Sequence, residues 1–226
     1  MGFFDWLFPS KIHVELADEI WMTHEAKQRG FVQRLQQHIK EHDRLIIVVH
    51  FVDSMEFVCE LLRQAQIDFE HIQHAWDARD TANFLQQSEN TIVILAESLP
   101  DTRAIGQSKQ VDEFSPITSI FVYEKHLLLS QDERITLFAK SLPCRTELKY
   151  FLSLEDPLIK IFFGDWVQDW LTSAGGLQED EAIESKMVGR RIRTAQKMIE
   201  EKIGNQPFAG PNPETTQQWL ERAQVQ

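Results

Sequence analysis

Cysteine is scarce in this sequence, which has only Cys59 and Cys144 among its 226 residues. Two thiols cannot form the disulfide framework on which small secreted domains depend, so a reducing compartment is expected. The opening segment, MGFFDWLFP, lacks the basic region and the small-residue cleavage site of a secretory signal. The protein is therefore expected to be cytoplasmic.

Long apolar runs and an excess of positive charge are also absent. No stretch approaches the roughly 18 apolar residues that a membrane-spanning helix needs, so no transmembrane segment is predicted. Lys and Arg number 23 against 35 Asp and Glu, which gives a net charge of −12. An acidic surface repels the phosphates of nucleic acids and of anionic lipids, so nucleic acid is not an expected partner. With 42% hydrophobic and 26% charged residues, the composition is that of a folded globular chain.

Two short patterns resemble reactive sites, and neither is complete. Residues His38 to His42 fit the H-x-x-E-H pattern of inverted zinc proteases, in which two histidines share a helix face. The pattern lies at the polar end of a predicted helix, and nothing downstream nominates the third ligand that a catalytic zinc needs. Cys144 has no base beside it in the sequence that would activate a nucleophile. No metal site is therefore predicted.

Short apolar runs alternate with amphipathic segments through the middle of the chain. The runs are rich in β-branched residues, which is typical of strands buried on both faces. Strands are predicted at 45–51, 67–72, 91–95, 117–123 and 148–152, and helices at 23–42, 53–62, 77–84 and 130–140. Thr23 is the predicted N-cap of the first helix, and Asp53 or Ser54 that of the second. Short connections between alternating strands and helices imply right-handed crossovers, so the predicted fold class is α/β, a parallel sheet with helices on both faces.

The C-terminal part is predicted to be helical and then polar. Helices are predicted at 155–171 and 180–203, separated by Gly175 and Gly176. The predicted division is an aromatic arm at 1–17, the α/β domain at 18–172, a linker with a helix at 173–204, and a polar tail at 205–226. The tail is rich in Pro, Gln and Thr, so partial disorder is expected, and a short helix around Trp219 is compatible with it.

Five stretches of the chain form long or uncommon signatures. They are YFLSLED at 150–156, LIKIFFGD at 158–165, EDEAIESKMV at 179–188 followed by AQK at 195–197, DEIWMT at 18–23, and EKH at 124–126. Together they resemble the SecA family, the bacterial preprotein translocase ATPases. The resemblance covers residues 18–203 and implies the second of two RecA-like nucleotide-binding domains, followed by the first turns of the family's long scaffold helix. In the family this domain closes the ATP site against the first motor domain.

The resemblance breaks at residues that would handle nucleotide. A G-x-x-x-x-G-K-[ST] loop, which binds phosphates through backbone N–H groups and a lysine, does not occur in the sequence. The family's G-R-G-T-D motif falls on residues 100–104. Pro100 stands at its first glycine and Ala104 at its acidic residue, so neither the flexible turn nor the carboxylate is kept.

The family's second nucleotide motif, Q-x-x-G-R-x-G-R-x-G, supplies arginines to the γ-phosphate and falls without gaps on residues 134–143. Its two arginine positions become Phe138 and Ser141, and its first glycine becomes Leu137. An arginine in this role is worth on the order of 10³–10⁵ in rate, because it neutralises charge in the transition state. The resemblance therefore implies a degenerate nucleotide site with no bound cofactor and no catalytic residue.

The functional hypothesis is a catalytically inactive SecA-like domain that acts as a protein-binding accessory or regulatory module in protein transport. The expected partner is a SecA-type motor or another translocase component. One alternative is a half-site that completes the nucleotide site of a partner ATPase in trans. Another is a structural protein that associates with itself, which would make it a homo-oligomer.

Two segments are candidates for binding a partner. The N-terminal arm places Phe3, Phe4, Trp6, Leu7 and Phe8 in one compact apolar cluster. A cluster of this size should be buried, and its own domain, a partner protein and a membrane interface all remain open as the place of burial.

The second candidate segment is basic. Arg190 and Arg191 lie on the last predicted helix together with Lys186, Arg193 and Lys197. These cations could contact an acidic partner, or they could form a solvated helix face with the neighbouring glutamates.

Overall fold

The computed structural model describes residues 13–41, 44–87, 90–100, 116–163, 181–184, 186–203 and 213–223. In chain order its elements are β1 (His13–Glu15), β2 (Glu19–Trp21), α1 (His24–Glu41), β3 (Arg44–Val49), α2 (Val52–Gln64), β4 (Glu70–Ile72), α3 (Ala78–Gln86), β5 (Asn90–Leu95), the 3-10 helix η1 (Ala96–Ser98), β6 (Ile117–Val122), α5 (Leu129–Ser141), β7 (Arg145–Ser153), α6 (Pro157–Phe163), β8 (Ile183–Glu184), α8 (Lys186–Ile203) and α9 (Thr216–Ala223). Among these described helices, none is both long and apolar enough to cross a bilayer.

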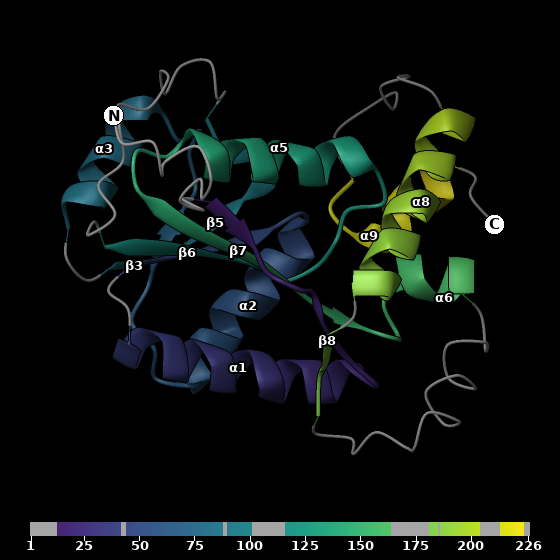
Figure 1. Ribbon diagram of the computed structural model, residues 1–226, viewed down its shortest axis with the longest axis horizontal. Helices are drawn as coiled ribbons and strands as arrows, with labels where there is room; N and C mark the ends of the chain where they lie inside the picture. Colours follow the sequence, from purple (N-terminus) through teal and green to yellow (C-terminus); the bar gives the residue numbers. More distant parts are fainter. Residues whose placement is uncertain are drawn as a thin grey trace, which may run out of the picture.

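The strands form one sheet with the order β4-β5-β3-β6-β7-β2-β8, and β1 pairs with the first half of β7. Neighbouring strands are parallel, except that β8 runs antiparallel to β2. Because β3 pairs with β5 on one side and β6 on the other, the strand order reverses at β3. The carboxyl ends of β3 and β6 therefore flank the place where sheets of this kind bind ligands. The predicted α/β fold with a parallel sheet is confirmed (Figure 1).

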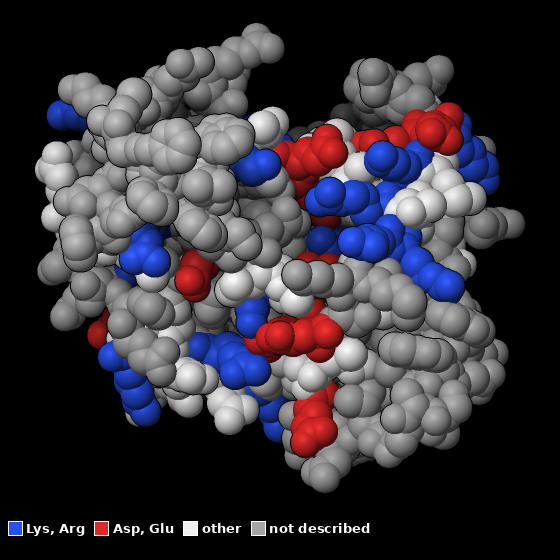
Figure 2. Space-filling view, in the orientation of Figure 1, with Lys and Arg blue, Asp and Glu red and all other residues white. Residues whose placement is uncertain are grey.

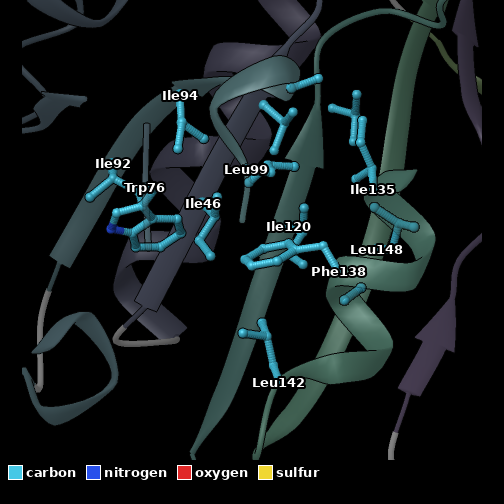
Figure 3. Close-up of a cluster of buried hydrophobic side chains, with 14 of the residues drawn as sticks. Ile46, Trp76, Ile92, Ile94, Leu99, Ile120, Ile135, Phe138, Leu142 and Leu148 are labelled. Carbon is cyan, nitrogen blue, oxygen red and sulfur yellow. The ribbon is translucent and has the colours of Figure 1, made fainter. Parts of the chain in front are cut away.

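Helices cover both faces of the sheet, and β3 shows how. All six residues of β3 are buried. Ile46 and Val48 belong to the apolar cluster under α3 and α5, whereas Leu45, Ile47 and Val49 belong to the cluster under α1 and α2. Figure 3 shows the first of these two clusters. This burial on both faces explains why residues 45–49 form an uninterrupted apolar run in the sequence.

A third apolar cluster joins the C-terminal helices to the carboxyl end of the sheet. It contains Leu152 of β7, Leu158 of α6, Ile192 of α8 and Trp219 of α9. Figure 1 shows these three helices gathered at one end of the sheet. The short helix predicted around Trp219 is confirmed as α9. Trp219 is 3% exposed, so this helix contributes to the core. The rest of the predicted polar tail, apart from residues 213–223, lies outside the described residues.

Three short strands were not predicted from the sequence. β1 and β2 have three residues each and β8 has two, which is too short for a period of two to be recognised. β8 also corrects a helix boundary. The helix expected to begin at residue 180 begins at Lys186, because Ile183 and Glu184 pair with β2.

The predicted helix starts are partly right. The Thr23 Oγ1 accepts a hydrogen bond from the Ala26 N–H at 3.1 Å, which confirms Thr23 as the cap of α1. The prediction for α2 is wrong, because its N-cap is Phe51, which has no side-chain hydrogen bond. Asp53 and Ser54 lie inside the first turn instead, where the positive end of the helix dipole stabilises a carboxylate.

Candidate functional site

Buried polar side chains collect where β3, β6 and β7 end. His50 follows β3, and the Glu124-Lys125-His126 segment that resembles a SecA signature follows β6. Asp132 of α5 and Gln196 of α8 approach them from outside the sheet. We refer to His50, Glu124, Lys125, His126, Asp132 and Gln196 as the carboxyl-end network. It occupies the reversal point of the strand order, where an open α/β sheet commonly binds its ligand.

Asp132 is the centre of this network and is 4% exposed. Its Oδ1 accepts a hydrogen bond from the His126 N–H at 3.0 Å and lies 3.0 Å from the His50 Nε2. Its Oδ2 accepts from the Gln196 Nε2 at 2.7 Å, and the same amide group donates to the His126 carbonyl at 2.6 Å. One carboxylate thus joins the ends of β3 and β6 to α8.

Asp132 is held ionised although it is buried. Burial alone would raise its pKa, but the hydrogen bond with His50 and the charge of Lys125 outweigh burial and set the pKa of Asp132 below its usual range. The Lys125 Nζ lies 3.9 Å from the Asp132 Oδ2 and 3.5 Å from the Asp18 Oδ2. It also sits 3.5 Å above the centre of the Tyr150 ring, a cation–π contact. The buried charge therefore has a cation and three hydrogen-bonding groups around it.

His126 is held neutral in the same network. Burial, and then the proximity of His50, lower the pKa of His126 to about 3. Its Nδ1 lies 2.9 Å from the Leu128 N–H and accepts a hydrogen bond from it, so the ring proton is on Nε2. The ring stacks on Phe51 with centroids 5.4 Å apart and meets the Trp219 ring edge-on at 5.6 Å. A neutral ring is suited to this aromatic surrounding, because an imidazolium would be poorly solvated there.

The pKa of Glu124 is shifted in the opposite direction to that of Asp132. The Glu124 Oε1 accepts from the His50 N–H at 3.0 Å and its Oε2 from the Ser54 Oγ at 2.7 Å. Burial raises the pKa of Glu124 more than the charges of His50 and Lys27 and these hydrogen bonds lower it. The two carboxyl groups of the network therefore have pKa values shifted in opposite directions, a pattern found in acid–base sites as well as in structural networks.

The second retained SecA signature, Ser-Leu-Glu-Asp at the end of β7, forms a neighbouring ion pair. Lys27 is 2% exposed. Its Nζ lies 3.3 and 3.4 Å from the two carboxylate oxygens of Asp156. The same carboxylate accepts hydrogen bonds from the N–H and the Oγ of Ser153 at 2.9 and 3.0 Å. Lys27 also lies 4.1 Å from the centre of the Tyr123 ring. This pair fastens α1 to the turn after β7.

A small cavity lies beside these groups in the described part of the chain. A cavity of about 30 Å³ is lined by Glu124, Lys125 and Asp156 together with Thr216 of α9 and apolar residues of α6 and α8. A volume of this size holds about one water molecule. The C-terminal helices thus cover this part of the carboxyl edge of the sheet, and the network is suited to fixing those helices.

The positions at which the SecA resemblance predicts nucleotide-binding residues lie apart from this network, on α5 and after β5. Phe138 is fully buried, and its ring lies 6.0 Å from that of Trp76. Leu137 is 54% exposed, and the Ser141 Oγ donates a hydrogen bond to the Phe138 carbonyl at 2.7 Å. Pro100 is buried, whereas Ala104 lies outside the described residues. Figure 3 shows Phe138 in the same apolar cluster as Leu99, so the structure brings the two motif stretches together.

Arg134 ties these two stretches to each other. Its Nη2 donates to the Glu97 carbonyl at 3.0 Å and to the Leu99 carbonyl at 2.6 Å. The guanidinium therefore holds η1 against α5. Its N–H groups donate to the backbone of the segment that carries Pro100. It does not stand at either of the arginine positions that the SecA resemblance assigns.

The remaining candidate residues are placed as follows. Arg190 and Arg191 are exposed on α8, and Figure 2 shows Lys and Arg side chains gathered along that helix. Phe3, Phe4, Trp6, Leu7 and Phe8 lie outside the described residues. His38 is buried against Phe121, with ring centroids 5.1 Å apart, and His42 is outside the described residues. The described parts of the chain contain no group of three or more His, Cys, Asp or Glu that could hold a metal ion.

Three members of the network were missed in the sequence: His50, Asp132 and Gln196. His50 could have been predicted from the sequence, because it follows the central strand β3. Polar residues at that edge are ligand candidates in parallel sheets. Gln196 belongs to a stretch that resembles SecA but was given no role. Asp132 carries no local signal, since its partners come from β3, β6 and α8.

Comparison with known proteins agrees with the sequence signatures. No family model matches the chain. A protein translocase subunit SecA of Clostridium botulinum is 23% identical over 188 residues, which are 83% of this chain and 22% of that protein. SecA of Xanthomonas euvesicatoria is 24% identical over 213 residues, covering 81% of this chain and 23% of that protein. The chain is similar to SecA. It spans less than a quarter of the length of these SecA proteins.

Among solved structures, the C-terminal part of the Fun30 ATPase domain covers 77% of this chain and 54% of its own, with 8% identity and a TM-score of 0.40. The similarity to SecA extends over most of the sequence that folds into the sheet and its helices. The resemblance to this family, first drawn from short signatures, is thereby confirmed at the level of sequence.

Proposed function

We propose that this protein is a SecA-like motor domain that neither binds nor hydrolyses nucleotide and that acts as a protein-binding accessory module in protein transport. The observation that carries the proposal is the burial of Phe138. The SecA resemblance assigns an arginine to this position, and the side chain is instead an apolar part of the core with no exposed surface.

Phe138 cannot take over the role of an arginine, for two physical reasons. A phenyl ring carries no positive charge for the γ-phosphate, whereas an arginine finger contributes on the order of 10³–10⁵ in rate. Turning the ring out to make room for a ligand would expose it to water at a cost of about 1.5–3 kcal/mol. Ser141, at the second arginine position, is neutral and already bonded to the Phe138 carbonyl.

The link to protein transport rests on the similarity to SecA over most of the chain. Segments that resemble SecA contribute Glu124, Lys125, His126 and Gln196 to the carboxyl-end network and Asp156 to the Lys27–Asp156 pair, and these contacts support the fold. In SecA the corresponding domain presses against a first motor domain. A separate copy with the same framework would dock on such a motor in trans and act through that contact.

Calorimetry on the full chain with Mg·ATP and Mg·ADP tests the first half of the proposal. No saturable heat is expected under conditions in which a SecA protein from the same cells, used as the positive control, binds both nucleotides. Saturable binding or hydrolysis by the isolated chain would overturn the assignment.

Titration of the labelled chain into the same purified SecA protein tests the second half. A saturable complex that forms equally with and without nucleotide is expected. Failure to associate contradicts the accessory role. Nucleotide binding that arises at this chain only in the complex contradicts nucleotide incompetence and supports a half-site completed in trans.

A further inference from the structure

A cavity opens at the amino edge of the sheet, at the other end of the strands from the carboxyl-end network. It is formed by the last turns of α1, the link from α2 to β4, and the starts of β3 and β5. Its volume of about 830 Å³ lies within the range of roughly 300–1,000 Å³ that is usual for binding pockets. No residue of the carboxyl-end network lines it. We refer to it as the amino-edge cavity.

The apolar lining of the amino-edge cavity is continuous with the core. Leu45 of β3 belongs to the apolar cluster under α1 and α2, and the half-buried Ile67 and Phe69 pack against that cluster. Ile39, near the end of α1, also lines the cavity and is 42% exposed. An apolar side chain that entered the cavity would therefore extend the cluster and cover an isoleucine that is otherwise in contact with water.

The charged lining residues are arranged differently. Lys40, Asp68 and Glu70 are all exposed and line the same cavity. Pockets with an apolar wall and a few polar groups are typical of binding sites, because burial supplies the affinity and the polar groups remain solvated.

The link from α2 to β4 gives the cavity a preformed wall. Gln66 has a left-handed backbone, with a φ of 56°. Its N–H donates to the Arg63 carbonyl at 3.0 Å. The Ile67 N–H donates to the Leu62 carbonyl at the same distance. These two hydrogen bonds form a Schellman motif, which ends a helix and satisfies its last carbonyls. Ile67 is therefore held beside the cavity by the backbone.

The first described strand begins at the level of this cavity. In the register of the sheet, His13 pairs with Thr146, and Thr146 pairs with Thr118. Thr118 pairs with Arg44, and Arg44 pairs with Asn90. These five residues form one row across β1, β7, β6, β3 and β5, and Asn90 at the far end of the row lines the cavity. The chain that precedes His13 is therefore attached at the edge of the sheet where the cavity opens.

The sequence before His13 is long enough to span this edge. Neighbouring strands lie about 4.8 Å apart, so His13 is about 14 Å from Arg44 and about 19 Å from Asn90 across the row. At about 3.4 Å per extended residue, Phe8 can lie up to about 17 Å from His13, and Phe3 up to about 34 Å. Residues 3–8 can therefore reach the cavity without any rearrangement of the sheet.

We propose that residues 3–8 of the same chain dock in the amino-edge cavity and bury their apolar side chains there. Phe3, Phe4, Trp6, Leu7 and Phe8 form an apolar cluster of a size that soluble proteins rarely leave exposed. The chain's own arm is the occupant because it is attached at the same edge. A short tether gives it an effective concentration of the order of millimolar, far above that of any arm from another copy at micromolar protein.

The cavity and any external surface would then compete for the same side chains. A partner protein or a membrane that binds the arm has to displace it from the amino-edge cavity first. Docking within the chain requires neither nucleotide incompetence nor a transport partner, so it can hold or fail without them.

Quenching of a fluorophore by Trp6 tests the docking in the full chain. Bimane is attached at Gln64→Cys, an exposed position next to the cavity lining. Both native cysteines are buried, so a thiol label attaches at the new position. An indole quenches bimane only at short range, so the labelled chain should be dimmer than the same chain with Trp6→Phe. The phenylalanine keeps an aromatic ring in the arm and removes only the quencher.

Two matched substitutions of exposed isoleucines serve as variant and control. Ile39→Glu places a charge in the cavity lining and should abolish the Trp6-dependent quenching. Ile161→Glu changes an isoleucine of α6 that is 37% exposed, and it should leave the quenching unchanged. Far-UV circular dichroism checks folding, which exposed substitutions should not alter.

The position of the label and the source of the arm are controlled separately. Bimane at Met198→Cys, an exposed position on α8, should show no dependence on Trp6. A labelled Trp6→Phe chain should not be quenched when unlabelled wild-type chain is added, because the arm then comes from another copy. Equal quenching at the two label positions, quenching that appears on mixing, or quenching that persists in Ile39→Glu would each overturn the proposal. A label at Gln64→Cys that does not respond to Trp6 would also overturn it.

Discussion

Asp132 and Phe138 are both buried on α5, and they lie in interiors of opposite chemistry. Asp132 faces a polar interior in which hydrogen bonds and a nearby lysine stabilise its charge. Phe138 faces an apolar interior formed by Trp76, Leu99 and the sheet. Residues of three SecA-like stretches, Asp18, Lys125 and Gln196, lie around Asp132, whereas Phe138 stands where the resemblance predicts an arginine. The comparison indicates that the network fastens the C-terminal helices whether or not a nucleotide site exists.

The largest expected effect is that of removing the centre of the polar interior. Asp132→Ala leaves the His126 N–H and the Gln196 amide without their buried acceptor, so the free energy of unfolding should fall by about 3–5 kcal/mol. Urea denaturation at pH 7 measures the change. Glu133→Ala, an exposed neighbour on the same helix, serves as the control and should change stability by about 0.5 kcal/mol or less. Equal effects of the two substitutions would show that the network contributes nothing.

A nearly equal effect is expected in the apolar interior. Phe138→Ala opens a cavity beside Trp76 and should cost about 3–4 kcal/mol. Phe138→Leu, which keeps most of the apolar volume, should cost about 1.5 kcal/mol. Leu137→Ala on the exposed side of α5 is the matched control and should be within about 0.5 kcal/mol of wild type. If Phe138→Ala were as mild as Leu137→Ala, position 138 would not be part of the core.

A third test compares the polar and the apolar interior by the pH dependence of the free energy of unfolding. The pKa of His126 is lowered to about 3 in the folded protein, whereas it is 6.5 in the unfolded chain. Above about pH 6.5 both states are neutral at this ring. As the pH falls, only the unfolded state takes up the proton, so stability decreases by up to about 1.4 kcal/mol per pH unit until the folded pKa is reached.

Between pH 6.5 and 4.5 this ring should therefore cost about 2–3 kcal/mol, measured as the change in urea unfolding free energy. His126→Asn keeps an acceptor for the Leu128 N–H and does not titrate, so its stability should depend less on pH in this range. Phe138→Leu should leave the pH dependence unchanged. Identical pH profiles for wild type and His126→Asn would place the titrating group elsewhere.

The smallest of these effects concerns the link from the network to α8. Gln196→Ala removes one donor to the Asp132 carboxylate and one to the His126 carbonyl, and it should cost about 1.5 kcal/mol. Gln196→Glu places a second carboxylate against Asp132 and should be more destabilising. Lys197→Ala, one position away and exposed, is the control and should leave the unfolding free energy unchanged. A stable Gln196→Glu variant would argue against an ionised Asp132.

The α/β architecture was predictable because its signals are local. Residues 45–49 of β3 are all apolar, and that follows from burial on both faces. The SecA signatures were also readable in the sequence, as was the absence of an arginine at positions 138 and 141. The candidate site was predictable only in part. Glu124 and Asp156 lie in quoted signatures, but their partners His50 and Lys27 lie far away in the chain.

By itself, the sequence determined which segments form β3 to β7 and the helices that flank them, because apolar periodicity and β-branched runs act over a few residues. It also determined that neutral residues, Phe138 and Ser141, stand where the SecA resemblance predicts arginines. Only the tertiary structure decided that Asp132 and Gln196, 64 residues apart, share a hydrogen bond, and that Trp219 covers the end of the sheet. The physical reason is that a buried charge is stable only where several distant segments supply its partners together.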